Sequence, residues 1–184
     1  MALSHTILAT LGDKALSGYD LWKEFAECTT HYWKASQQQV YRELSKLETQ
    51  AAIAVEVVPQ DGRPDKKLYS ITPEGKEMLI QWIAEASEPT AIREEVLVKV
   101  LAANLVEPEV IIAELKRRQQ IHSQNLAACK EMEQEFLARE SELSLKEKCK
   151  YLTLRRGIRY EAEWVGWCEE AIAFFQEQNS QSSN

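Results

Sequence analysis

The stretch from residue 36 to residue 72 limits the fold most, because a helix-start signal is followed directly by two short strand patterns. Ser36 and Gln39 have the spacing of a capping box, in which each side chain bonds the backbone amide of the other residue. Apolar residues then recur at the spacing of one helical face, at Val40, Leu44, Leu47 and Ala51. The sequence therefore predicts a helix that begins at Ser36 and buries one face.

The two segments after this helix alternate in polarity, as half-buried strands do. The first covers residues 53–57 and the second residues 68–71, and residues 59–65 between them are rich in turn-forming types. Gly62 can adopt the positive φ that a tight turn needs. We therefore predict a hairpin with Arg63 at its tip.

Three helices are expected before and up to this hairpin. Residues 3–11 carry one apolar face and are followed by Gly12, a helix stop, and Ser17 can cap a second helix that ends near residue 28. The third is the helix that begins at Ser36. This order is that of a winged helix-turn-helix with a two-stranded wing.

A domain boundary is predicted at Pro89, because a proline disfavours helix in the residue before it. Residues 1–86 would form the winged helix and residues 87–89 a linker. Beyond the linker, apolar spacing indicates helices over 91–105, over 108–140 and from 145 onward. We assign residues 90–178 to a long-helix dimerisation domain and the polar residues 179–184 to a disordered tail. The fold class is mainly α.

The last helix is apolar over a wider arc than a thin helical domain can cover, which favours self-association. The predicted dimer contacts share one stripe and are Tyr151, Leu154, Ile158, Val165, Ile172 and Phe175. Trp164 and Trp167 lie on an adjacent stripe. They could wall a cavity for a planar aromatic effector, or they could simply pack at a helix interface.

A recognition helix needs hydrogen-bonding side chains near its amino terminus, because that end meets base edges in the major groove. Glutamine can pair with adenine and arginine with guanine, whereas lysine and tyrosine suit phosphates. The predicted DNA contacts are Lys34, Gln37, Gln38, Tyr41 and Arg42 around the third helix, and Arg63, Lys66 and Lys67 in the wing. The alternative is an ordinary polar helix face, which most exposed helices have.

Composition argues against several other classes of protein. The net charge of −7, from 29 acidic and 22 basic residues, argues against a protein that coats nucleic acid indiscriminately. Any DNA affinity must therefore come from the placement of charge. A signal peptide pattern and an apolar run of about 20 residues are both missing, so we expect a cytoplasmic protein.

The sequence carries no pattern of a metal site or an active site. The cysteines, at Cys28, Cys129, Cys149 and Cys168, lack C-x-x-C spacing, and the three histidines are scattered, so we expect neither zinc nor a disulfide. No P-loop, G-x-S-x-G or H-E-x-x-H motif occurs. We therefore expect no catalytic residues, no metal and no cofactor.

Several motifs of the chain resemble the PadR family of bacterial transcriptional regulators. They are SGYDL at 17–21, VYREL at 40–44, GRP at 62–64 and LYSITPEG at 68–75. Beyond the linker, three more motifs resemble the carboxy-terminal domain of the longer, virulence-activator-like branch of this family. They are REEVLVKV at 93–100, LRRGI at 154–158 and WCEEA at 167–171.

This resemblance implies a homodimer with intertwined carboxy-terminal helices that binds an inverted repeat in double-stranded DNA and usually represses transcription. For some members it also implies a response to phenolic acids or planar drugs. A second class of function stays open, a dimeric adaptor whose winged helix binds a protein instead of DNA, which the acidic balance would suit.

Two residues depart from the family pattern. Ala51 stands where the family usually has glycine, and it should cost up to about 1 kcal/mol if it must adopt positive φ. Asp65 stands where a basic residue commonly follows Gly-Arg-Pro, so we expect a weaker attraction between the wing and phosphates.

Overall fold

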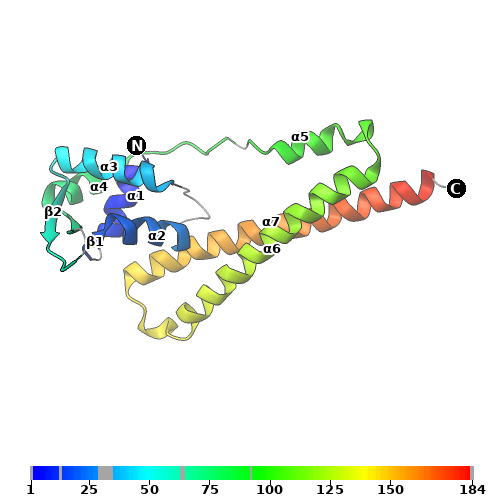
Figure 1. The fold of residues 1–184 in the computed structure, drawn as a ribbon. Coiled ribbons are helices and arrows are strands. Elements are labelled where there is room, and N and C mark those ends of the chain that lie inside the picture. Colours follow the sequence, from blue (N-terminus) through cyan, green and yellow to red (C-terminus); the bar gives the residue numbers. More distant parts are fainter. Residues whose placement is uncertain (1, 13, 29–34, 63–64, 92, 183–184) are drawn as a thin grey trace. The chain divides into compact units, whose positions relative to one another are not determined.

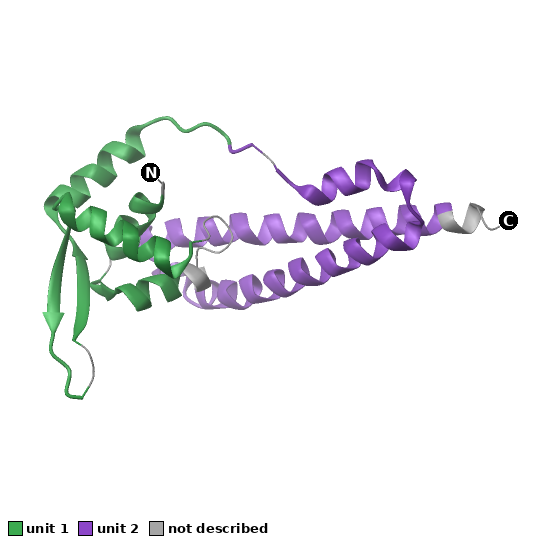
Figure 2. Ribbon diagram, turned by 45° about the horizontal axis from the view of Figure 1, so that its top comes forward, with its two compact units in different colours: residues 1–89 green, residues 90–184 purple. Residues whose placement is uncertain are grey.

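The computed structural model divides into two compact units, unit 1 (Met1–Pro89) and unit 2 (Thr90–Asn184), which Figure 2 colours green and purple. It describes residues 2–12, 14–28, 35–62, 65–91 and 93–182. None of the helices in these ranges has the length and apolar character that crossing a membrane requires. Each unit has its own hydrophobic core.

Unit 1 has the predicted order of helices and hairpin (Figure 1). Its elements are α1 (Ala2–Leu11), β1 (Leu16–Ser17), α2 (Gly18–Cys28), α3 (Gln37–Thr49), β2 (Ile53–Val58), β3 (Lys66–Ile71) and α4 (Pro73–Ala84). The predicted winged helix-turn-helix is confirmed. The sheet has one strand more than predicted, because β1 pairs antiparallel with β3 in the order β1-β3-β2. A strand of two residues is too short to show alternation in a sequence.

The core of unit 1 is formed by α1, α2, α3 and the sheet. Its most deeply buried side chains include Ile7, Leu8, Leu21, Val40, Leu44 and Leu47. Three of the four apolar residues predicted to face inward from α3 do so, but the fourth, Ala51, is exposed. That expectation was wrong because α3 ends at Thr49, and Ala51 lies beyond the helical face.

The chain leaves α3 through a Schellman motif with Ala51 in the left-handed region, at φ 55°. The amide of Ala51 donates to the carbonyl oxygen of Glu48 at 3.0 Å, and the amide of Ala52 donates to that of Leu47 at 2.9 Å. This region favours glycine, so alanine is strained here. Alanine in place of the glycine that is usual in the family therefore falls at a position where it lowers stability.

Unit 2 is helical. Its elements are α5 (Glu95–Leu101), η1 (Ala103–Leu105), α6 (Pro108–Leu137), η2 (Glu140–Glu142) and α7 (Leu145–Ser182). The two long helices α6 and α7 lie side by side as a hairpin (Figures 1 and 2). The buried core of this unit consists of Val96, Ala103, Ile111, Leu115 and Ile172.

Three predicted helix boundaries in unit 2 need correction. The helix predicted over 91–105 is divided into α5 and η1 and starts only at Glu95, because Glu94 is extended and its carboxylate pairs with Arg118 at 3.0 Å. Helix α6 ends at Leu137 instead of residue 140. Helix α7 runs to Ser182, so most of the tail predicted to be disordered is helical, since extending a formed helix costs little. Residues 183 and 184 lie outside the described residues.

Candidate nucleic-acid interface

The amino terminus of α3 is held by the predicted capping box. The amide of Gln39 donates to Ser36 Oγ at 3.2 Å, and the amide of Ser36 donates to Gln39 Oε1 at 2.8 Å. Gln37, Gln38 and Arg42 are all exposed. The predicted base-reading side chains therefore project from a helix end whose position is fixed.

Glu43 ties α3 to α1. Its carboxylate accepts a hydrogen bond from Ser4 Oγ at 2.6 Å and pairs with Lys46 at 3.0 Å. These two contacts, the one from Ser4 first, hold the pKa of Glu43 below its ordinary value. The acid beside Arg42 is thus engaged elsewhere, and Arg42 makes no ion pair with any residue that the structure describes. Its guanidinium can therefore meet an acceptor on DNA.

Tyr41 joins α3 to the start of α2. A Cβ added at Gly18 would lie 2.6 Å from Tyr41 Cε1, so the tyrosine ring lies close over the glycine backbone. The side chain still keeps 41% of its surface exposed. Tyr41 is therefore both a packing residue and a candidate phosphate contact.

The wing consists of β2 and β3, paired from Ile53 opposite Ile71 to Val58 opposite Lys66. Lys67 is exposed and makes no ion pair within the described ranges. Lys66, by contrast, pairs with Asp20 of α2 at 3.0 Å. The other predicted basic contacts, Lys34 and Arg63, lie outside the described residues.

A groove of about 460 Å³ lies between the start of α2, Tyr41 of α3 and the wing. Lys66 and Lys67 line it with Tyr41, so the structure brings three of the predicted DNA contacts together. Gln37, Gln38 and Arg42 are not among its lining residues. Sequence reasoning missed Asp20, which also lines this groove, because an acid in the first turn of a helix is common and does not indicate a partner.

The stripe of α7 that was predicted to form a dimer seam packs within its own unit. The Tyr151 hydroxyl donates to Glu133 of α6 at 3.0 Å, and Phe175 packs against the core that contains Ile172. The other members of the stripe, Leu154, Ile158 and Val165, are half-buried. Helix α6 thus covers much of the arc that a second chain was expected to cover. These contacts within one chain do not test the predicted seam, so the seam and dimerisation both stay predictions.

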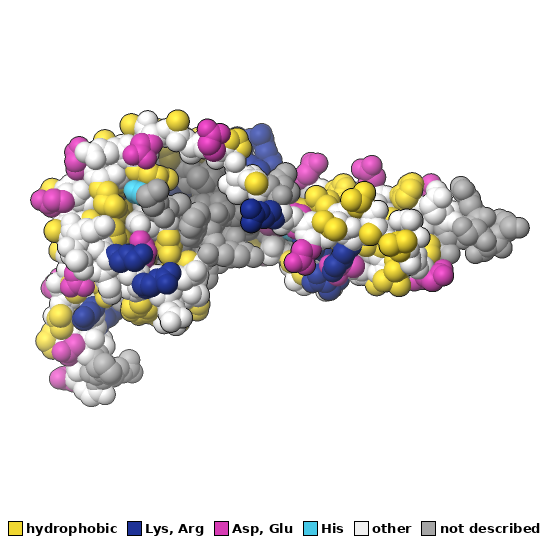
Figure 3. All heavy atoms as spheres, turned by 90° about the horizontal axis from the view of Figure 1, so that it is seen from above, with side chains coloured by type: hydrophobic (Ala, Val, Ile, Leu, Met, Phe, Trp, Pro, Cys, Tyr) yellow, Lys and Arg dark blue, Asp and Glu magenta, His cyan; other side chains and the backbone are white. Residues whose placement is uncertain are grey.

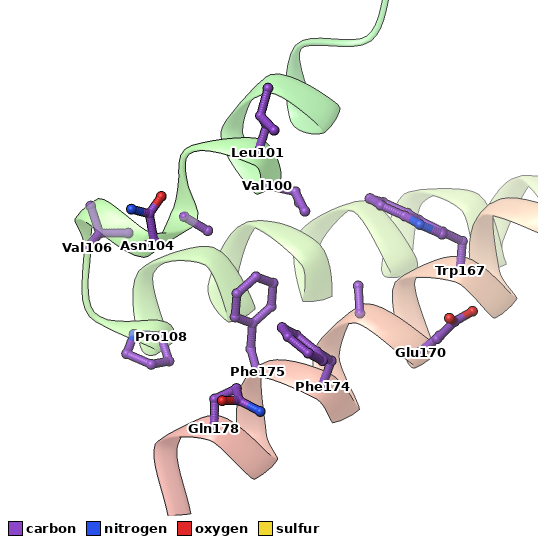
Figure 4. A pocket seen from close by; sticks show the side chains of 12 residues that line it. Val100, Leu101, Asn104, Val106, Pro108, Trp167, Glu170, Phe174, Phe175 and Gln178 are labelled. Atoms are coloured by element: carbon purple, nitrogen blue, oxygen red, sulfur yellow. The ribbon is translucent and has the colours of Figure 1, made fainter. Parts of the chain in front are cut away.

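The two tryptophans proposed as an effector site have different surroundings. The Trp164 ring stacks on His122 with centroids 5.0 Å apart, and the Arg118 guanidinium lies over it at 5.7 Å. Trp167 lines a groove of about 610 Å³ between α5, η1 and the end of α7, together with Phe174 and Phe175 (Figure 4). The packing interpretation suits Trp164, and the cavity interpretation suits Trp167.

A buried polar pair lies in the hairpin of unit 2. His122 Nδ1 is 2.6 Å from Glu161 Oε2, and these residues are 9% and 3% exposed. Asn125 also donates to this carboxylate, at 3.5 Å. Burial, and secondarily the charge of Glu161, raises the pKa of Cys129 to about 11. Over the part of the chain that is described, no three His, Cys, Asp or Glu residues come together as metal ligands.

Known proteins share both units of this chain. Residues 7–81 match the Transcriptional regulator PadR-like family, and residues 92–176 match Virulence activator alpha C-term. A probable transcriptional regulator of Mycobacterium tuberculosis, Rv1176c, is 32% identical over 96% of this chain and 99% of that protein. The match therefore extends over nearly the full length of both.

Two solved structures are similar over the same extent. The negative transcriptional regulator PadR of Bacillus subtilis is 26% identical over 93% of this chain and 96% of that protein. Its crystal structure in complex with operator DNA has a TM-score of 0.81 at 25% identity, covering 95% of this chain and 99% of that one. The virulence activator AphA of Vibrio cholerae has a TM-score of 0.76 at 30% identity, covering 96% and 99%.

Proposed function

We propose, from the premise that this chain belongs to the PadR-like family of transcriptional regulators, that it binds an inverted repeat in double-stranded DNA as a homodimer and represses transcription. The family consists of regulators and not of enzymes. The observation that carries the proposal is the capped end of α3, which exposes Gln37, Gln38 and Arg42 beside a wing. Bacillus subtilis PadR, a negative regulator crystallised with its operator, supports both the DNA partner and repression. We expect the protein to act in the cytoplasm.

The base contacts would come from α3 and the phosphate contacts from the wing. Gln38 can pair with adenine and Arg42 with guanine, each worth about 1–3 kcal/mol of discrimination against the wrong base. Lys67 is the described wing cation that is open to a phosphate, and we expect Lys34 and Arg63 to add to it. In a two-fold symmetric dimer the half-site centres should be about 10 base pairs apart, or a multiple of that distance.

Selection of bound sequences from random duplex DNA tests this proposal. We expect a symmetric motif, and we expect Gln38→Ala and Arg42→Ala to relax preference at matching positions of both half-sites. Lys67→Ala should weaken binding to all sequences alike and lower the salt slope by about one. Lys46→Ala is the matched control, since Lys46 is on α3 but pairs with Glu43. If no motif were enriched and all variants matched the parent, the adaptor function would replace this one.

The proposal of a homodimer is supported by apolar side chains that unit 2 leaves exposed. Val98, Leu105 and Val110 are 65%, 78% and 60% exposed. Figure 3 shows hydrophobic side chains gathered on the face of unit 2 that is seen from above. Large exposed apolar patches are characteristic of interfaces. We therefore add the region of α5 and η1 to the proposed dimer contacts.

Sedimentation at micromolar concentration tests this surface. Leu105→Asp places a charge in the proposed contact and should shift the protein toward monomer. Leu152→Asp is the control, because Leu152 is 63% exposed in α7 but lies outside the α5–η1 region. A parent that sediments as a monomer would contradict dimerisation, whereas equal sedimentation of the parent and both variants as dimers would contradict only the location.

An aromatic effector is a second part of the proposal, and Trp167 supports it. In Figure 4 Phe174 and Phe175 lie along the same groove, so a flat apolar ring would meet aromatic walls. The one charged residue among the described lining residues is Glu170, so a neutral or cationic compound fits better than a carboxylate. The effector must change DNA affinity by the same factor by which DNA changes effector affinity.

Tryptophan fluorescence titrated with flat dyes and phenolic acids gives the measurement for the effector. Trp167→Phe should abolish the response, whereas Trp22→Phe in unit 1 should not. Fluorescence and operator affinity that stayed unchanged across the whole panel would exclude this site.

A further inference from the structure

An ion pair joins the wing to the start of α2. Lys66 is the first residue of β3, and its Nζ lies 3.0 Å from Asp20 Oδ2 in the first turn of α2. The two side chains are 41% and 43% exposed. A phosphate group approaching Lys66 would therefore meet a lysine that already has a carboxylate beside it.

Asp20 is itself held from the other side by Ser17. The Ser17 hydroxyl donates to the same Oδ2 at 2.7 Å, and the Asp20 amide donates to Ser17 Oγ at 3.1 Å. Ser17 belongs to β1 and pairs with Leu68 of the wing. The hydrogen bond from Ser17, followed by that from Lys66, holds the pKa of Asp20 below its ordinary value. The Asp20 carboxylate is thus ionised at neutral pH. Its hydrogen bonds hold it to β1, which pairs with β3, the strand that carries Lys66.

The pair faces the groove where DNA contacts are proposed. Tyr41 of α3 and Lys67 of the wing line this groove with both members of the pair. Among the residues that the structure describes, the charged ones that line the groove are Asp20, Asp65, Lys66 and Lys67, two acids and two bases. A groove for a polyanion would gain affinity from unpaired cations, and here one of the two lysines is paired within the protein.

We propose that Asp20 determines specificity by acting as the counter-charge of Lys66, which weakens binding to DNA that lacks the operator sequence. This inference depends on the proposed DNA-binding function. Non-specific binding comes almost entirely from phosphate contacts, so a lysine bound to a carboxylate adds little to it. On the operator, base contacts from α3 fix where the wing lies, and the ion pair keeps its geometry. On other sequences the wing is free to shift, and a Lys66 released by removal of the Asp20 charge would capture a phosphate there.

The variant Asp20→Asn tests this role, because asparagine keeps the shape and an acceptor for Ser17 but removes the charge. Affinity for a random-sequence duplex should rise about fivefold at about 0.15 M salt, and the salt slope should steepen by about 0.9, the amount for one added phosphate contact. Operator affinity should rise less, so the ratio of operator to random affinity should fall. An equal rise on both duplexes, or no rise, would overturn the proposal.

Two further variants show whether Lys66 transmits the effect. Asp20→Asn combined with Lys66→Gln leaves the pair neutral, as in the parent, and should restore the salt slope of the parent. Asp65→Asn removes an acid from the same groove that has no ion-pair partner among the described residues, so it should change the slope much less. A slope that stayed steep in the double variant would mean that Asp20 acts only as a general negative charge.

Hydrogen exchange on each variant shows whether unit 1 stays folded. If Asp20→Asn lost protection throughout unit 1, Lys66→Gln would supply the test instead. A lysine that Asp20 already compensates should leave the salt slope on random duplex nearly unchanged when it is removed, whereas loss of a lysine that contacts phosphate would lower the slope by about 0.9 and overturn the proposal. Failure of this inference is distinct from failure of the proposed function. A parent that enriches no symmetric motif contradicts DNA regulation, whereas a parent that selects an operator and variants that discriminate equally well contradict only the role of Asp20.

Discussion

Units 1 and 2 both enclose a hydrophobic core between helices, but they fix their geometry by different means. In unit 1 the close contact is between backbone positions, since a Cβ added at Gly75 of α4 would lie 2.0 Å from the carbonyl oxygen of Ala52. In unit 2 a Cβ added at Gly166 of α7 would have no neighbour within 4 Å. The close contact in unit 2 is between the side chains of His122 and Glu161. A close backbone approach thus joins elements of the first unit, and a short side-chain contact joins the two long helices of the second.

This difference suits the roles proposed for the two units. The Thr72 amide donates to the carbonyl oxygen of Ala52 at 3.1 Å, and the Gly75 amide donates to Thr72 Oγ1 at 3.0 Å. The end of α3, strand β2 and the start of α4 are thereby joined through short backbone contacts. Reading bases requires side chains held within about 0.5 Å of the productive position, which such contacts provide. A helical hairpin that forms an interface does not need this precision.

The largest effect is expected from the buried pair in unit 2. His122→Leu removes the partner that lies 2.6 Å from Glu161 and should destabilise unit 2 by about 3–5 kcal/mol, because one member of a buried polar pair is then lost while the carboxylate stays buried. Replacing both residues by leucine should recover most of this loss. Hydrogen exchange should show lost protection in α6 and α7 while unit 1 is unchanged. Equal losses of protection in both units would show that they unfold together, which would contradict the difference that we infer between them.

A matched pair of glycine substitutions should act in opposite directions. Gly75→Ala forces its methyl group onto the Ala52 carbonyl and should destabilise unit 1 by about 1–3 kcal/mol or more. Gly166→Ala adds a methyl group in open space and should stabilise α7 by up to about 1 kcal/mol. Urea denaturation of the full chain, with exchange assigned to each unit, measures both. If the Gly75→Ala variant were as stable as the Gly166→Ala variant, the difference between the two units would be contradicted.

Ala51→Gly should stabilise unit 1 by about 0.5–1 kcal/mol, because glycine adopts the φ of 55° at this position without strain. The control is Ala54→Gly in β2, which should destabilise unit 1 by a similar amount, since glycine in a strand interior costs conformational entropy. Midpoints of urea denaturation compare the two variants with the parent. A loss of stability in Ala51→Gly would show that strain at the end of α3 is negligible.

The smallest effect concerns thiol reactivity in unit 2. Cys129 and Cys168 are buried, and burial raises the pKa of both thiols, whereas Cys149 is exposed. With a chromogenic disulfide reagent, Cys149→Ser should remove one rapidly reacting thiol, whereas Cys168→Ser should leave the rapid phase unchanged. Rapid reaction of Cys129 or Cys168 in the native protein would mean that the hairpin opens readily, so its side-chain pairing would be weaker than we infer.

Much of the fold could be predicted from local patterns in the sequence. The capping box at Ser36 and the turn at Gly62 both have the expected geometry, because each depends on residues that are neighbours in the chain. The exposed positions of Gln37, Gln38 and Arg42 follow from the same helical period. Their hydrogen-bonding chemistry made these side chains candidates for DNA contact, and the family resemblance supported that choice.

The tertiary structure decided what each surface packs against. The wide apolar arc of α7 was visible in the sequence, but the hydrophobic effect is not directional, so the pattern could not say whether α6 or a second chain covers it. The pairing of β1 with β3 and the ion pair between Asp20 and Lys66 join residues about 50 positions apart. Local periodicity carries no information at that separation, because contacts between distant segments depend on how the whole chain packs.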